Sequence, residues 1–351
     1  MPATEVIFIS TSLEAEHAER IRAAAGAASE IIHEPDLHPL PRYQGDHTGA
    51  PGFVRSAEQE ARWLSHLARA TILWDFPPGA SGSAAGLTLA PNVRWVQTTS
   101  AGVGQSVKRM GLAERPLIVT TSSGVHAGPL AEFVFLALLA QAKHLARLGR
   151  EQRARRWERY CCGELEGQTL LIAGAGKIGK RCGEIARAFG MRTIGIVSRP
   201  SPERAAELGL DEVFGPSGLA AALPRADAVV LCMPHTPETE GMISAAAIAA
   251  MKRGAALINV ARGAVVDEPA LTAALRSGQI GFAALDVTAV EPLPSSSPLW
   301  DMENVLISPH SASTAPGENR RIADIFCRNL DAYLGGRLHD MVNVLDKQRL
   351  Y

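Results

Sequence analysis

Short apolar runs alternate with segments of helical spacing along most of this chain. Such alternation is typical of α/β folds, in which helices cover a mostly parallel sheet. In the first third of the chain, the pattern predicts strands within 5–10, 29–34, 70–74, 93–99 and 117–121. It also predicts a helix near 56–69, whereas 39–52 is rich in proline and glycine and is expected to form a loop.

A second α/β series follows a strongly apolar helical segment. Apolar residues recur at helical spacing from Pro129 to Leu148, so we predict one long helix that ends at Gly149. The strands expected after it lie within 169–174, 192–197, 228–233, 255–260, 281–287 and 304–308. A last helix is predicted near 319–334, and the tail carries no strand series of its own. We therefore predict a domain built from both chain ends, 1–126 and 315–351, around a central domain, 127–314.

The composition disfavours several classes of protein. The 351 residues include 35 basic and 36 acidic ones, and a net charge of −1 gives no footprint for nucleic acid or an anionic membrane. The most apolar run, 130–140, contains Glu132 and is too short to span a bilayer, and the N-terminus lacks the pattern of a signal peptide. The five cysteines show no metal-ligand spacing, so we expect no metal site and a reducing cytoplasm.

A glycine-rich loop opens the second series. Gly174, Gly176 and Gly179 form a GxGxxG pattern between an apolar strand and a helix, with another strand after the helix. In that context the first glycine permits the tight turn, the second lets the backbone approach a pyrophosphate, and the third allows close helix–strand packing. The start of the helix, at Lys177 and Ile178, supplies backbone N–H groups and the positive end of a dipole. We predict a dinucleotide site here; the alternative is a glycine-rich turn that binds nothing.

The residues after the second strand of this series bear on the choice between NADP and NAD. NAD sites usually carry an acidic residue at this point, which accepts a hydrogen bond from the ribose 2′-hydroxyl. This chain has Ser198 and Arg199 there, and no acidic residue until Glu203. Because a guanidinium pairs with a phosphate and a hydroxyl can donate to one, we predict that NADP(H) is preferred and that NAD(H) is possible. The alternative is that Arg199 is a solvated loop residue.

Three polar residues each follow a strand of the second series. Arg262 follows the run AALINV, Glu291 follows GFAALDV, and His310 follows NVLIS. Ligands of open α/β sheets bind outside the carboxyl ends of the strands, so we expect these side chains to converge on one site beside the nicotinamide. There Arg262 would meet a substrate carboxylate, and His310 would pair with Glu291.

Several longer stretches now become informative together. They are SAGVGQ, GVHAGPLAEFVFLALL, GQTLLIAGAGKIG, VLCMPHTPET, INVARGAVVDEPAL, GFAALDV, EPLP with SPLW, NVLISPHSA and RNLDAYLGG. In this order, across nearly the whole chain, they resemble the D-isomer-specific 2-hydroxyacid dehydrogenase family, which includes glyoxylate/hydroxypyruvate reductases and phosphoglycerate dehydrogenases. The resemblance implies a Rossmann-type nucleotide-binding domain inserted in a discontinuous flavodoxin-like α/β substrate domain. It also implies a cleft between the domains and a homodimer formed largely by the central domain and the long helix.

The resemblance assigns roles to individual positions. The catalytic arginine, glutamate and histidine of the family fall on Arg262, Glu291 and His310. Protonated His310 would give a proton to the substrate carbonyl oxygen, Glu291 would stabilise the imidazolium, and Arg262 would orient the keto acid. Further positions match a carboxylate-binding backbone loop (Ala101, Gly102, Val103), the lining of the nicotinamide ring (Val260, Ala261), its amide (Asp286) and a strand end that faces the cofactor (Pro234, His235).

The sequence leaves the substrate open among glyoxylate, hydroxypyruvate, pyruvate and longer apolar 2-keto acids. We favour glyoxylate or hydroxypyruvate, because Ser198 and Arg199 resemble the NADP-type pair of those reductases. A phosphoglycerate dehydrogenase-like enzyme is an alternative, although the loop DFPPGASG, 75–82, offers a phosphate no basic anchor. A second alternative is a non-enzymatic, dinucleotide-binding protein, since corepressors are built on the same scaffold.

Overall fold

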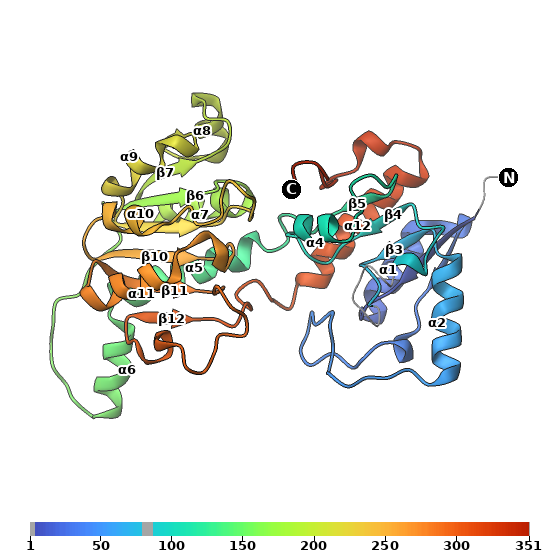
Figure 1. Ribbon diagram of the computed structural model, residues 1–351, viewed down its shortest axis with the longest axis horizontal. Helices are drawn as coiled ribbons and strands as arrows, with labels where there is room; N and C mark the ends of the chain where they lie inside the picture. The colour runs from blue at the N-terminus through green and yellow to red at the C-terminus, as the bar shows by residue number, and fades with distance from the viewer. Residues whose placement is uncertain (1–3, 79–86, 351) are drawn as a thin grey trace. The chain divides into compact units, whose positions relative to one another are not determined.

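Two parallel sheets organise the residues that the computed structural model describes, 4–78 and 87–350 (Figure 1). They belong to two compact units, the first made of Met1–Val125 with Thr314–Tyr351 and the second of His126–Ser313. The second unit is thus inserted in the first.

The first unit is built on a five-stranded parallel sheet in the order β2-β1-β3-β4-β5, which is a flavodoxin-like order. Its strands are β1 (Glu5–Ile9), β2 (Ser29–Ile32), β3 (Ile72–Trp74), β4 (Trp95–Gln97) and β5 (Ile118–Thr120). Its helices are α1 (Ala15–Ala25), α2 (Ala57–Arg69), α4 (Gly104–Arg109) and α12 (Glu318–Leu334), with 3-10 turns at Gly26–Ala28, Pro35–Leu37 and Leu338–Asp340.

Local signals explain why these elements form where they do. The helix predicted near 56–69 begins after Ser56, whose hydroxyl accepts from the Gln59 backbone N–H while the Gln59 side chain accepts from that of Ser56. Such a capping box satisfies two backbone donors that the first turn leaves open. α12 closes one face of the sheet, where the Phe326 ring stacks on Trp95 with centroids 4.9 Å apart.

The second unit is built on a seven-stranded parallel sheet in the order β12-β11-β10-β9-β6-β7-β8. Its strands are β6 (Thr169–Ala173), β7 (Arg192–Ile196), β8 (Glu212–Phe214), β9 (Ala228–Leu231), β10 (Ala255–Asn259), β11 (Ile280–Leu285) and β12 (Val305–Ile307). Its helices are α5 (Ala127–Ala142), α6 (Leu145–Arg153), α7 (Lys177–Ala188), α8 (Pro202–Leu208), α9 (Leu219–Ala222), α10 (Ala245–Ala250) and α11 (Glu268–Ser277). Short 3-10 turns occupy Pro216–Gly218, Leu223–Arg225, Gly263–Val265 and Pro298–Asp301.

This second sheet has the Rossmann arrangement, because the order reverses between β6 and β9 and both halves run outward from that point. The predicted fold class, a Rossmann-type domain inserted in a discontinuous flavodoxin-like α/β domain, is therefore confirmed. Both faces of the sheet are buried in apolar clusters, which explains why its strands read as continuous apolar runs.

The prediction of one long helix from Pro129 to Gly149 is wrong. α5 ends at Ala142, His144 takes a left-handed backbone conformation with φ of 52°, and α6 leaves at a bend of 62°. The chain returning from α6 supplies the reason: the Gly163 N–H donates to the Ala142 oxygen at 2.9 Å, and the Tyr160 hydroxyl donates to the Lys143 oxygen at 3.2 Å. These donors satisfy carbonyls that a continued helix would have bonded.

Among residues 4–78 and 87–350, no single helix is long and apolar enough to cross a membrane. The bent pair of α5 and α6 passes that test only together, by length and composition.

Burial of His38 predicts that the protein loses stability in acid. His38 is 5% exposed, its Nε2 lies 3.1 Å from the Ile9 oxygen, and burial lowers its pKa to about 4. Between the ordinary value of 6.5 and about 4, the unfolded chain binds a proton that the folded chain excludes. The free energy of unfolding should therefore fall as the pH falls through this window, by up to about 3 kcal/mol.

Urea unfolding at a series of pH values measures this effect. His38→Gln keeps a donor for the Ile9 oxygen but does not titrate, so its stability should depend less steeply on pH than that of the parent protein. An identical dependence in both proteins would show that His38 is not the group responsible.

Candidate active site

The three glycines of the GxGxxG loop meet three different surroundings. Gly174 has φ of 89°, and a Cβ there would lie 2.5 Å from the Met233 backbone. A Cβ on Gly179 would lie 2.8 Å from Cγ2 of Ile172, so this glycine lets α7 pack on β6. At Gly176 a Cβ would meet only one oxygen, at 4.0 Å, so the backbone here borders open space. These surroundings fit the roles of turn, packing contact and approach to a pyrophosphate.

α7 begins directly at this open space. Its N-cap is Gly176, so no side chain caps the first turn, and the backbone N–H groups from Lys177 onward are oriented toward that end of the helix. Lys177 is exposed at its surface, yet partial desolvation lowers the pKa of its ammonium group. Ile178 packs against the apolar cluster beneath the sheet. The end of α7 is therefore suited to bind an anionic group.

The side chains after β7 are presented to solvent. Ser198 and Arg199 are both exposed, and the Arg199 guanidinium forms no ion pair with any residue in the described part of the chain. Glu203, the next acidic residue, lies in the first turn of α8, where hydrogen bonds to its own backbone and to Ser201 lower the pKa of its carboxyl. A phosphate beside Arg199 would find a cation that has no competing partner in that part of the chain.

The segment after β9 turns back on itself. The Thr239 hydroxyl donates to the Pro234 oxygen at 2.8 Å, and Nε2 of His235 lies 3.7 Å from a Glu240 carboxylate oxygen. Just before it, the Cys232 thiol donates to the Gly174 oxygen at 3.2 Å, and burial raises the pKa of that thiol. Cys232 thus ties this segment to the glycine loop as a neutral group.

Asn259, which the sequence did not single out, shapes the loop that carries Arg262. Its buried side chain accepts from the Ala261 N–H and donates to the Arg262 oxygen, both at 3.0 Å. Val260 and Ala261 are buried, whereas Arg262 is partly exposed and donates to the Ala261 oxygen at 2.7 Å. A buried asparagine ending an apolar strand is the signal that could have revealed this role.

Glu291 and His310 are in direct contact. Nδ1 of His310 lies 2.8 Å from a Glu291 carboxylate oxygen, and both side chains are about two-fifths exposed. The other carboxylate oxygen of Glu291 accepts from the Thr288 backbone N–H at 3.2 Å. This contact fixes the Nδ1 side of the ring, which leaves Nε2 as the nitrogen available to a reactant.

The backbone of His310 is strained and is held by Asp286. His310 has φ of 54°, a conformation that non-glycine residues adopt at a cost of about 1–3 kcal/mol and that persists when the surroundings impose it. The backbone N–H of His310 donates to the backbone carbonyl oxygen of Asp286 at 2.9 Å. The buried Asp286 carboxylate accepts from the backbone N–H groups of Ser311 and Ala312, both at 2.9 Å, and from the Ser308 hydroxyl at 2.7 Å.

The loops of Arg262 and Glu291 also touch. A Cβ on Gly263 would lie 1.9 Å from the Thr288 oxygen, so only glycine allows this approach. Since β10, β11 and β12 are parallel neighbours, their carboxyl ends lie on one edge of the sheet. At the carboxyl ends of its strands, the second unit therefore gathers a guanidinium, a carboxylate and an imidazole. The glycine loop lies at the same end of the sheet.

Ala101, Gly102 and Val103 belong to the first unit. They directly precede α4; Ala101 and Gly102 are exposed, and Val103 is buried as its N-cap. Their structural unit is thus different from that of Arg262, Glu291 and His310.

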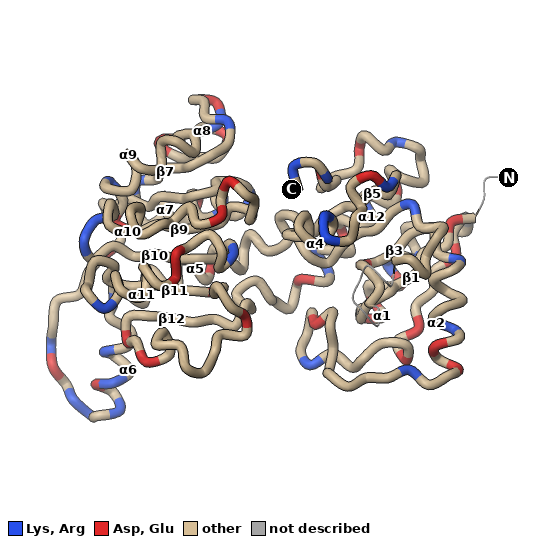
Figure 2. Tube along the Cα trace, viewed as in Figure 1, with Lys and Arg blue, Asp and Glu red and all other residues tan. Residues whose placement is uncertain are grey.

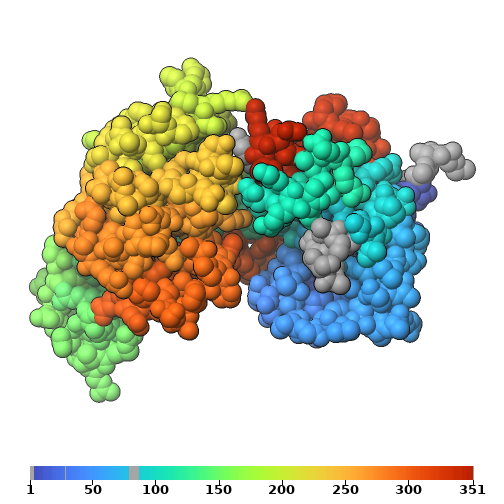
Figure 3. All heavy atoms as spheres, viewed as in Figure 1, coloured from blue at the N-terminus to red at the C-terminus, as the bar shows by residue number. Residues whose placement is uncertain are grey.

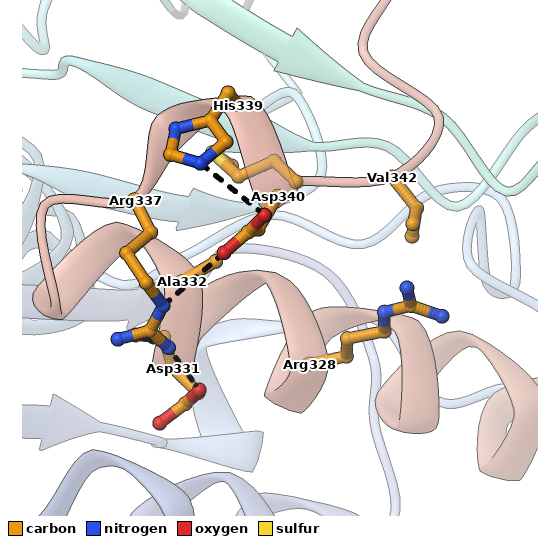
Figure 4. A pocket seen from close by; sticks show the side chains of 8 residues that line it. Arg328, Asp331, Ala332, Arg337, His339, Asp340 and Val342 are labelled. Carbon is orange, nitrogen blue, oxygen red and sulfur yellow. Dashed lines mark hydrogen bonds and ion pairs between the residues drawn. The ribbon is translucent and has the colours of Figure 1, made fainter.

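Two hollows lie away from these residues. One, of about 520 Å³, lies at the end of α12, where Arg337 pairs with Asp331 and Asp340 at 2.6 and 3.3 Å (Figure 4). The other, of about 590 Å³, is lined by residues at the amino ends of β6, β7 and β8. Neither has the position expected of a dinucleotide site, because that site lies at the carboxyl ends of the strands. Within the described ranges, no group of three or more His, Cys, Asp or Glu side chains could hold a metal ion.

Comparison with known proteins gives sequence relatives for most of the chain. The profile described as D-isomer specific 2-hydroxyacid dehydrogenase, NAD binding domain, matches residues 135–312. Glyoxylate reductase of Aeropyrum pernix is 35% identical over 265 residues, 72% of this chain and 76% of that protein. D-3-phosphoglycerate dehydrogenase of Mycobacterium leprae is 33% identical over 297 residues, 81% of this chain but only 55% of that protein.

A solved structure matches over the full length. It is a D-isomer specific 2-hydroxyacid dehydrogenase from Xanthobacter autotrophicus Py2 in complex with NADPH and MES. Its sequence is 29% identical, and the TM-score is 0.76. The match covers 99% of this chain and 100% of that chain.

Proposed function

Since this chain belongs to the D-isomer specific 2-hydroxyacid dehydrogenase family of NAD(P)-dependent oxidoreductases, we propose that it reduces a small 2-keto acid to the D-2-hydroxy acid, with NADPH. The observation that carries the proposal is the contact of 2.8 Å between His310 and Glu291, at the carboxyl ends of the strands, where Arg262 also lies. The reaction is reversible, and His310 serves as acid in reduction and as base in oxidation.

The proton and the substrate are handled by the chain's own side chains. The chemistry supplied by reduced nicotinamide, when bound, is hydride transfer to the carbonyl carbon. His310 donates the proton on Nε2 to the carbonyl oxygen, while Glu291 accepts a hydrogen bond from Nδ1 and stabilises the imidazolium. The planar fork of Arg262 binds the carboxylate and carbonyl oxygens and orients the keto acid.

The remaining positions surround that chemistry in the proposal. The dinucleotide phosphates lie at the glycine loop and the start of α7, supported by the open space beside Gly176. Backbone N–H groups of the 101–103 loop bind the substrate carboxylate. The nicotinamide is lined by Val260 and Ala261, with Asp286, Pro234 and His235 beside it.

We propose that NADP(H) is preferred and that NAD(H) is accepted more weakly. The exposed Arg199, with no ion pair among the described residues, supports a 2′-phosphate site, as does the NADPH bound to the relative from Xanthobacter autotrophicus. Arg199→Ala should lower the ratio of kcat/KM for NADPH to that for NADH by about 10- to 150-fold, the loss of a hydrogen bond to a charged group.

Initial rates with each cofactor measure that ratio. Arg276→Ala, at an exposed arginine on α11, is the matched control and should leave it unchanged. A ratio in Arg199→Ala equal to that of the parent protein would remove Arg199 from the 2′-phosphate site.

Glyoxylate or hydroxypyruvate is the substrate we favour. Glyoxylate reductases are among the relatives, and the Aeropyrum pernix enzyme is matched over most of its length. A phosphoglycerate dehydrogenase-like activity is the alternative, although the match spans about half of the Mycobacterium leprae enzyme. Residues 79–82 of the loop DFPPGASG lie outside the described residues, so the lack of a basic anchor there rests on the sequence alone.

We also propose a homodimer that uses α6. This helix buries none of its residues: its Leu145 and Leu148 are 51% and 44% exposed, and Trp157, in the chain after it, is 97% exposed. α6 and the chain that follows it project from the body of the second unit (Figure 3) and include several basic residues, which are blue in Figure 2. Apolar side chains exposed together favour burial against a second copy.

Five cysteines that are all free thiols support a reducing, cytoplasmic location.

Initial rates with NADPH and NADH against glyoxylate, hydroxypyruvate, pyruvate, phenylpyruvate and phosphohydroxypyruvate test the function. We expect NADPH-dependent turnover of the small unphosphorylated acids. Turnover of phosphohydroxypyruvate alone would favour the phosphoglycerate dehydrogenase-like alternative. Tight NADPH binding without turnover of any acid would favour a non-enzymatic corepressor-type protein.

A further inference from the structure

The last residues of the chain run along the edge of the first sheet. Val344 forms an antiparallel bridge with Thr120, at the end of β5. The bridge is flanked by two backbone hydrogen bonds, from Thr121 N–H to the Asn343 oxygen at 2.9 Å and from Leu345 N–H to the Val119 oxygen at 2.8 Å. The tail 341–350 therefore covers the β5 edge of the sheet.

Asn343 binds the segment that leaves the sheet. Its side-chain nitrogen donates to the oxygens of Thr121 and Ser123 at 3.1 and 2.9 Å, and its own φ is 59°. Asparagine tolerates this left-handed conformation better than most residues. The tail is thereby fixed at one end, against the residues that follow β5.

The other end of the tail is bound by the turn that follows α4. Nζ of Lys347 donates to the Leu112 oxygen at 3.2 Å and to the Arg115 oxygen, in the turn after this helix. The Asp346 carboxylate accepts from the backbone N–H groups of Gln348 and Arg349 at 2.9 and 3.0 Å, which shapes the last turn of the tail.

The tail also touches the first residue of α4. A Cβ on Gly104 would lie 1.9 Å from the Leu350 oxygen and 2.7 Å from its Cβ. Gly104 directly follows Ala101, Gly102 and Val103. The 101–103 loop therefore connects β4 to α4, and the first residue of α4 packs against the tail.

We propose that the tail 341–350 positions the 101–103 loop for binding of the substrate carboxylate, with Lys347 and Gly104 as positioning residues. The inference rests on the proposed function, because the loop has a carboxylate to bind only if the substrate is a keto acid. Backbone donors bind an anion well only when their geometry is held, so a looser tail should weaken substrate binding first.

Steady-state kinetics of Lys347→Ala test this inference. We expect KM for the keto acid to rise by about threefold to tenfold, with kcat within about twofold and KM for NADPH unchanged, as for an interaction made equally in ground and transition states. Lys347→Arg keeps a cationic donor and should restore most of the affinity. Lys108→Ala, at an exposed lysine of α4 whose side chain forms no hydrogen bond or ion pair with the described residues, is the matched control.

Gly104→Ala is the second variant. It forces the backbones of α4 and the tail apart and should raise the same KM, whereas Gly149→Ala adds a Cβ that reaches only Arg153 at 3.5 Å. An unchanged KM for the keto acid in Lys347→Ala and Gly104→Ala, or an equal rise in KM for NADPH, would overturn the inference alone. Absence of turnover in the parent protein would instead overturn the proposed function and this inference with it.

Discussion

Replacement of His310 by alanine is expected to lower kcat by about 10²- to 10⁴-fold, the usual contribution of a positioned acid or base. The imidazole is held by Glu291 at 2.8 Å on its Nδ1 side, and among the described residues no other histidine follows β12 directly. Binding of NADPH should change little, since the glycine loop and the end of β7 are untouched.

Steady-state rates and NADPH titration by fluorescence separate these effects. His339→Ala, at an exposed histidine of the first unit, should retain full activity and serves as the control. Turnover of His310→Ala within about tenfold of the parent protein would exclude His310 as the acid that protonates the carbonyl oxygen.

Arg262→Ala is expected to reduce kcat/KM for the keto acid by about 100-fold or more, mainly through a higher KM and also through a lower kcat. The guanidinium orients as well as binds, so its loss removes both affinity and alignment. Arg262→Lys should rescue little, because an ammonium lacks the planar fork that suits a carboxylate.

The measurement compares kcat and KM for the same keto acid across these variants, with Arg276→Ala again as control. The side chain of Asn259 holds the loop backbone at Ala261 and Arg262, so the loop should persist when the guanidinium is removed. Parent-like KM and kcat in Arg262→Ala would show that the substrate carboxylate binds elsewhere.

Most of the fold was predictable from the sequence because both sheets are parallel and buried. Strands buried on both faces are continuous apolar runs, and each predicted run overlaps one of the strands β1–β7 or β9–β12. β8 was missed: it has three residues and begins with the exposed Glu212, so only two apolar residues stand in a row there. The break between α5 and α6 was also missed, because its donors, Tyr160 and Gly163, lie far along the chain.

The candidate site divides in the same way. Arg262, Glu291 and His310 were predictable because each follows an apolar strand of one sheet and carries a charge or a titratable ring. The groups that hold them were not. Thr288 acts through its backbone N–H, and Asn259 and Ser308 act on backbone groups or carboxylates that only the folded loops bring near. Asp286 was predicted beside the nicotinamide amide, and the structure adds its hold on the His310 loop.

The most direct test of the central claim is the product itself. The parent protein is incubated with NADPH and hydroxypyruvate, and the product is resolved by chiral chromatography while NADPH consumption is followed. We predict D-glycerate, formed in equal amount to the NADPH consumed. L-glycerate, or no glycerate from a protein that binds NADPH, would contradict the assignment of this chain as a D-2-hydroxyacid dehydrogenase that reduces small keto acids.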